Sequence, residues 1–242
     1  MKVVTIFTTL ALVLLVGPAA FADTGDDVID HGPFERLLEK YVDDKGMVDY
    51  QGLRSSEADR RALADYTKKI GETSAAGKSQ NAQKAFLINA YNALVIEDVI
   101  ERWPVENVTE EEGFFDGKRH RVAQGSVTLD RLEKEFIHDR FDDRRTHFAV
   151  ICAAKSCPRL RTTAFRADNV EAMLDSIAEE YVPQVTEVRG DKVVTSQLFE
   201  WYGERFAEDA GSVQAFLARY VGDEVLDKEL EFREYDWRIN KQ

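Results

Sequence analysis

The sequence of 242 residues has only two cysteines, five prolines and four histidines. After the first residues, no apolar run approaches the ~20 residues that a membrane helix needs. Lysine and arginine do not cluster, and the net charge is −13. Because phosphate contacts require clustered positive charge, we expect neither nucleic acid nor anionic lipid as a partner. No glycine-rich nucleotide loop or Gly-x-Ser-x-Gly elbow occurs, so kinase, dehydrogenase and serine-hydrolase activities have no support, and no cofactor is predicted.

The N-terminal residues 1–22 have the pattern of a secretory signal peptide. A positive start with Lys2 precedes the apolar stretch Val3–Val16, and Ala20-Phe21-Ala22 forms a small-x-small cleavage site. Cleavage would remove Lys2, the one charge in this segment, and change the net charge from −13 to −14. The sequence therefore predicts a protein exported to the periplasm or the extracellular medium, without a stable membrane span after cleavage.

The rest of the chain predicts a helix-rich α+β fold, with a flexible acidic N-terminus at 23–32 and a single globular domain at 33–242. Helices are expected where apolar residues recur every three or four positions: from Pro33, at 57–71, at 82–103, from Thr128 to about His138, at 167–182 before Pro183, from Ser196, and from Ser212 to about Val221. Hairpins are expected at 114–122, with an Asp116-Gly117 turn, and at 185–195.

The predicted helix 82–103 is apolar nearly all round between Ala85 and Ile96. Such a helix should be central and buried, and we expect it to pack on a small mixed or antiparallel sheet. Asn89 and Asn92 lie three positions apart on one face of it. A buried amide without a partner costs about 1–3 kcal/mol. The two asparagines therefore either bond to the backbone of a loop or form a polar cluster that orients a catalytic group or binds substrate.

A second distinctive stretch runs from His147 to Leu160 and contains both cysteines. Phe148–Cys152 predicts a short, fully buried strand, followed by a loop that Pro158 closes. In an exported protein, two cysteines with C-x4-C spacing most simply form a disulfide, here Cys152–Cys157.

A cysteine nucleophile with His147 as its base is the alternative interpretation of the same stretch. In a regular strand Cys152 points away from His147, so Cys157 is the first candidate for the thiol and Cys152 the second. Asn89, Asn92 or Asp236 would orient the imidazole. A zinc site made by the two cysteines and His147 is a third alternative, but the spacing matches no compact zinc pattern, and no metal site is predicted.

Several separated segments together resemble the domain-of-unknown-function family 547. They are Tyr41-Val-Asp-Asp-Lys-Gly-Met-Val-Asp-Tyr50, Lys84-Ala-Phe-Leu-Ile-Asn-Ala-Tyr-Asn-Ala-Leu94, Val127-Thr-Leu-Asp-Arg-Leu-Glu133, Arg145-Thr-His-Phe-Ala-Val-Ile-Cys-Ala-Ala-Lys-Ser-Cys-Pro-Arg-Leu160 and Tyr235-Asp-Trp-Arg-Ile-Asn240. The resemblance implies a single domain and an exported bacterial setting, and it assigns no reaction. The family pattern usually has Glu-His where this chain has Glu133-Lys134, so a role of that histidine does not transfer.

Two classes of function follow from these observations. The first is an exported binding or structural module with a disulfide-pinned loop and a polar cleft, which takes an unknown small molecule or peptide. The second is a cysteine hydrolase or acyl transferase acting on an amide or thioester. Tyr91, Ser156 and Trp237 are candidate binding residues in either case. His31, His120 and His138 are interpreted as surface or hairpin residues. Trp201, Tyr202, Tyr235 and Trp237 are interpreted as core aromatics that are also able to wall a pocket.

Overall fold

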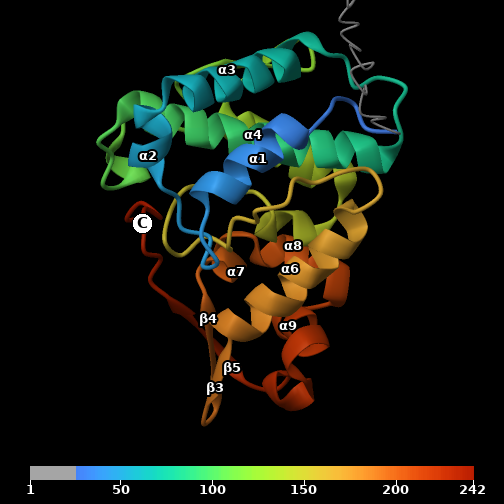
Figure 1. Ribbon diagram of the computed structural model, residues 1–242. Helices are drawn as coiled ribbons and strands as arrows, with labels where there is room; N and C mark the ends of the chain where they lie inside the picture. Colours follow the sequence, from blue (N-terminus) through green and yellow to red (C-terminus); the bar gives the residue numbers. More distant parts are fainter. Residues whose placement is uncertain (1–25) are drawn as a thin grey trace, which may run out of the picture.

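Helices form most of the protein in the computed structural model, which describes residues 26–242 (Figure 1). The α-helices are α1 (Gly32–Tyr41), α2 (Tyr50–Ser55), α3 (Glu57–Glu72), α4 (Gln80–Arg102), α5 (Leu129–Arg131), α6 (Val170–Val185), α7 (Leu198–Trp201), α8 (Gly203–Ala210) and α9 (Val213–Val221). Short 3₁₀-helices are η1 (Val108–Glu110), η3 (Arg144–Phe148) and η4 (Asp223–Val225), and η2 (Leu132–Asp139) is a π-helix. The predicted signal peptide lies outside the described residues.

Two small sheets complete the fold of residues 26–242. One is the antiparallel pair β1 (His120–Val122) and β2 (Gly125–Val127). The other is mixed, because β4 (Lys192–Ser196) pairs antiparallel with β3 (Glu187–Arg189) and parallel with β5 (Glu229–Arg233). The predicted helix-rich α+β class is therefore confirmed, and so is the hairpin within 185–195.

The first hairpin differs from its prediction. Its turn is made by Ala123 and Gln124, both with positive φ, rather than by Asp116 and Gly117. Ala123 and Gln124 donate backbone hydrogen bonds to the carbonyls of Ile70 and Gly71 at the end of α3. Contacts with a distant helix therefore determine where this hairpin turns.

The predicted long helix is α4, and it is buried along nearly its whole length. Ser79 caps its N-terminus by accepting a hydrogen bond from the Ala82 N–H. Its main neighbours are helices, namely α2, α3, α6 and η2, whereas α6 and α7 pack on the three-stranded sheet. Figure 1 shows the same arrangement, with α4 among the upper helices and β3, β4 and β5 at the far end of the molecule. The expected packing of this helix on a sheet is thus replaced by packing among helices.

Phe148–Cys152 does not form the predicted strand. The 3₁₀-helix η3 ends at Phe148, and the chain then follows an irregular course. The segment is buried as expected, but Asn92 replaces a neighbouring strand as its hydrogen-bond partner. The Asn92 amide donates to the Ala149 carbonyl at 2.9 Å and accepts from the Ile151 N–H at 2.9 Å. Because a side chain satisfies these buried backbone groups, no sheet is needed there.

Asn89 binds a second part of the same irregular region. Its amide donates to the Phe165 carbonyl at 2.7 Å and accepts from the Phe165 N–H at 3.1 Å. Of the two alternatives left open by the sequence, the structure thus shows both asparagines bonded to loop backbone.

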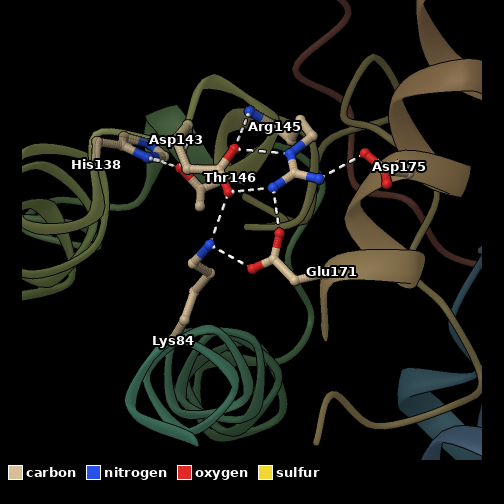
Figure 2. A network of polar contacts seen from close by, with 7 residues as sticks. All are labelled: Lys84, His138, Asp143, Arg145, Thr146, Glu171 and Asp175. Carbon is tan, nitrogen blue, oxygen red and sulfur yellow. Dashed lines mark hydrogen bonds and ion pairs between the residues drawn. The ribbon is translucent and has the colours of Figure 1, made fainter. Parts of the chain in front are cut away.

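Lys84 makes a third polar connection from α4 (Figure 2). Its side chain is almost fully buried, and its Nζ lies 2.8 Å from both Asp143 and Glu171. Arg145 contacts the same two carboxylates and also Asp175. The network joins α4, η3 and α6, so it holds the start of the irregular segment against the central helix.

Two further differences concern element ends. Pro183 lies inside α6, which continues to Val185, although a proline removes one backbone hydrogen bond there. In the expected flexible segment 23–32, residues 23–25 are outside the described part, while Ile29 and His31 are buried and the His31 Nδ1 lies 2.7 Å from the Tyr66 hydroxyl. Within residues 26–242, no helix is both long and apolar enough to cross a membrane.

Substituting Lys84 with methionine should destabilise the fold by about 2–4 kcal/mol at neutral pH, because the largely buried Asp143 carboxylate loses one of its two cations. Burial favours a higher pKa for Asp143, but hydrogen bonds from Arg145 and Lys84 outweigh it and hold the pKa below its ordinary value. The contribution of the ion pair is therefore present above the ordinary value of 3.8 and is lost as pH falls through the folded-state pKa. Urea unfolding at several pH values measures the difference.

Lys69→Met on the exposed face of α3 is the matched control and should change stability by no more than about 0.5 kcal/mol. An equal loss in both variants, or a Lys84 effect that persists undiminished at acid pH, would contradict this role of the ion pair.

Candidate functional site

The π-helix η2 places two chemically active side chains on one face. Glu133 and His138 are five positions apart, which in an α-helix separates side chains by about 140° around the axis. In a π-helix, residues five apart are joined by backbone hydrogen bonds and therefore share a face. The Glu133 Oε1 and His138 Nε2 atoms accordingly lie 3.6 Å apart.

Glu133 is a carboxylate held by two tyrosines. The Tyr91 hydroxyl on α4 donates to its Oε2 at 2.8 Å, and the Tyr202 hydroxyl between α7 and α8 donates to its Oε1 at 2.7 Å. Burial by itself favours a raised pKa, but the contacts with His138, Tyr202 and Tyr91 outweigh it, so the pKa of Glu133 lies below its ordinary value. The carboxylate is therefore ionised at neutral pH. Among the described residues, no lysine or arginine lies within 4.0 Å of it.

His147 lies beside this group in an aromatic stack. Its ring centroid is 3.7 Å from that of His138 and 4.1 Å from that of Tyr202. The residue is 3% exposed, and neither ring nitrogen has a hydrogen-bond partner within the described part of the chain. Burial, followed by the nearby positive side chains, lowers the pKa of His147 well below its ordinary value. His147 is thus a neutral imidazole whose two ring nitrogens make no hydrogen bond. A buried polar group without a partner costs about 1–3 kcal/mol of folding free energy.

Glu133 and His147 line a cavity of about 190 Å³, which we call the aromatic cavity. One wall consists of Trp201, Tyr235 and Trp237, whose ring centroids lie 4.7–5.5 Å apart. Trp201 is 45% exposed, although a large apolar side chain is normally buried. The other lining residues are Phe115, Asp130, Lys134, Val150, Cys152, Pro158, Leu198 and Tyr202.

Cys152 and Cys157 form a disulfide with their Cα atoms 6.3 Å apart, as the C-x4-C spacing predicted. The bridge lies between the aromatic cavity and a second hollow. Cys152 lines the aromatic cavity, with its Sγ 3.6 Å from the Tyr235 hydroxyl oxygen. Cys157 and Ser156 line the other hollow, so the loop separates the two.

The predicted polar cluster around His147 is not assembled. Asn89 and Asn92 bond to loop backbone, and His147 has no partner at either nitrogen. Asp236 instead bonds to the Arg238 guanidinium at 2.5 Å, which lowers the pKa of Asp236 to about 2. Ser156 accepts a hydrogen bond from the Asp236 N–H at 2.8 Å. Of the candidate site residues, the aromatic cavity contains His147, Cys152 and Trp237, and Tyr91 reaches it only through Glu133.

Sequence reasoning missed Glu133 and His138, whereas it named Tyr202 as an aromatic able to wall a pocket. His138 was expected at the surface, but it is buried, and its Nδ1 lies 2.9 Å from the Thr146 hydroxyl. His120 is buried as well, with its Nε2 3.1 Å from Asp98. The one available signal was the glutamate of the Glu-His family pattern, which corresponds to Glu133.

The alternative zinc site lacks its thiolate ligands, because the sulfur atoms of Cys152 and Cys157 are bonded to each other. Within residues 26–242, no group of three or more His, Cys, Asp or Glu side chains is arranged to hold a metal ion.

Taken together, the fold and site define a disulfide-bonded, helix-rich α+β domain with a small aromatic cavity around an ionised glutamate. Residues 76–182, somewhat less than half of the chain, match the family model described as "Protein of unknown function, DUF547". This match supports the resemblance to that family over the matched region. No curated protein and no solved structure matches the chain significantly. The matched region includes Glu133, His147 and both cysteines, whereas the aromatic wall lies outside it.

Reducing the disulfide should lower the stability of the fold by about 2 kcal/mol, the chain-entropy value for so short a loop. The untreated protein should show no free thiol by alkylation and intact mass. Chemical denaturation with and without confirmed reduction, repeated on a Cys152→Ser/Cys157→Ser variant, measures the effect. Free thiols before reduction, or identical denaturation curves after it, would contradict a structural bridge.

Proposed function

We propose that this chain is an exported binding domain whose aromatic cavity takes the positively charged head of a small organic molecule. The observation that carries the proposal is the ionised Glu133, which lines an aromatic-walled cavity. Among the described residues, no lysine or arginine lies within 4.0 Å of its carboxylate. The disulfide supports an exported location, because such bonds persist in oxidising compartments. The signal peptide remains a prediction from the sequence.

The charges around the cavity favour a cation. Asp130 and Lys134 neutralise each other, with their charged atoms 2.6 Å apart, so Glu133 is the carboxylate of the cavity lining that has no lysine or arginine partner among the described residues. The faces of Trp201 and Trp237 attract cations through their ring quadrupoles. A positive charge placed between these rings and Glu133 is therefore attracted by the rings on one side and by the carboxylate on the other.

The cavity volume favours a small head group. At about 190 Å³ it lies below the ~300–1,000 Å³ of pockets that enclose drug-sized ligands. A quaternary or primary ammonium group is of suitable size. His147 is neutral, and neither of its ring nitrogens has a hydrogen-bond partner in the described chain. One nitrogen can donate a hydrogen bond to the rest of the ligand and the other can accept one. This contact requires the Tyr202 ring, which packs on the imidazole, to move aside.

The alternative function is a cysteine hydrolase or acyl transferase with His147 as base. It requires a free thiol beside the imidazole. The disulfide occupies both sulfur atoms, and Cys157, the first candidate, lines the hollow on the other side of the loop. These observations favour binding over cysteine catalysis.

Choline and its uncharged carbon analogue 3,3-dimethylbutanol test the proposal directly, because they differ mainly in charge. Titration monitored by tryptophan fluorescence should show choline binding about tenfold more tightly, a difference of ~1.4 kcal/mol. Trp201 and Trp237 line the cavity and report on occupancy. Glu133→Gln should abolish the preference while keeping the shape of the side chain.

Glu135→Gln, an exposed position on the same helix, is the matched control and should retain the preference. Equal binding of both ligands to the native protein would overturn the choice of a cation. Absence of saturable binding by either ligand would overturn the binding function of the cavity.

A further inference from the structure

A second hollow lies on the other side of the disulfide loop and has the opposite charge. We call it the basic groove. It has a volume of about 490 Å³, and its charged lining residues are Lys45, Lys155, Arg159, Arg233 and Glu234. Four positive charges and one negative charge therefore meet in one groove, although the whole chain has a net charge of −13. This arrangement differs from the dispersed charge that the sequence suggests.

Tertiary contacts bring these distant residues together. Gly46 has φ +77°, and a Cβ atom at this position would clash with Arg159 and Leu160. The glycine therefore allows the turn that carries Lys45 to approach Arg159 closely. Lys155 belongs to the disulfide loop, and its N–H donates to the Arg238 carbonyl at 2.8 Å. The disulfide thus helps to position one side of the groove.

The four cations retain most of their capacity to bind an anion. No carboxylate lies within 4.0 Å of the amino groups of Lys45 and Lys155 among the described residues. Arg159 contacts Glu180 at 3.3 Å and Arg233 contacts Glu187 at 3.1 Å, with both arginine side chains 40% exposed. Such exposed ion pairs contribute only about 0–1 kcal/mol, so an anionic ligand can compete for the guanidinium groups.

We propose that the basic groove is a binding site for a small molecule that carries several negatively charged oxygen atoms. Two guanidinium forks provide bidentate contacts to oxyanions, and two ammonium groups add mobile charge. The Tyr181 and Ser196 hydroxyls, which lie 3.0 Å apart in a hydrogen bond, line the groove and add neutral polar contacts. The site is independent of the cation site proposed above, because Tyr235 is the one residue that the linings of the two hollows share.

Isothermal titration of the full chain with inorganic pyrophosphate and with citrate, in metal-free buffer, tests this site. Phosphate and carboxylate oxygens share the required chemistry, and comparison of the two titrations shows which the groove prefers. Saturable binding is expected for at least one of them, and acetate at the same ionic strength should not compete. Lys45→Gln/Lys155→Gln should weaken the binding by about tenfold or more.

Lys68→Gln/Lys69→Gln removes the same two charges from the exposed face of α3 and should change affinity by less than about twofold. An equal loss in this control would show that net charge alone is responsible and would overturn the site. The proposal would also fail if the native protein bound neither anion, or if the groove variant, with an unchanged circular dichroism spectrum, bound as well as the native protein.

Discussion

The structure depends on three buried polar side chains of α4 that hold an irregular segment in place. Lys84, Asn89 and Asn92 bind Asp143, Phe165 and the Ala149–Ile151 backbone, respectively. The segment between them carries His147 and the disulfide. Within it, Phe148–Cys152 has no strand partner, so the conformation of that part depends on these contacts from the central helix. A polar group buried without a partner would cost about 1–3 kcal/mol of folding free energy. Each of these side chains must therefore meet its hydrogen-bond or ion-pair partner on the segment.

This constraint explains how an otherwise apolar helix positions a polar site. On one side of α4, the asparagines fix the backbone that follows His147. On another side, the Tyr91 hydroxyl reaches Glu133 on the π-helix. The same helix therefore orients both the imidazole and the carboxylate of the aromatic cavity. Glu133 and His147 of the cavity lie within the matched family region, whereas the residues of the aromatic wall lie outside it.

Local patterns predicted most helices, because burial of one helix face leaves a clear period in the sequence. Patterns failed where distant groups determine the conformation. Phe148–Cys152 has the composition of a buried strand, but Asn92 satisfies its backbone, a contact between residues about sixty positions apart. The sequence predicted an α-helix from Thr128 to about His138, in which Glu133 and His138 would not lie on the same face. They are neighbours because this part of the chain is a π-helix. The disulfide, by contrast, followed from spacing and the predicted compartment alone.

Hydrogen exchange at the Ile151 amide tests this dependence on α4 most directly. Its N–H donates to the Asn92 side chain, so Asn92→Ala removes the acceptor without touching the segment itself. The account predicts that exchange at Ile151 becomes at least about tenfold faster, while amides within α9 keep their native protection. Unchanged protection of Ile151 in a folded Asn92→Ala protein would contradict the account, because the segment would then hold its conformation without the central helix.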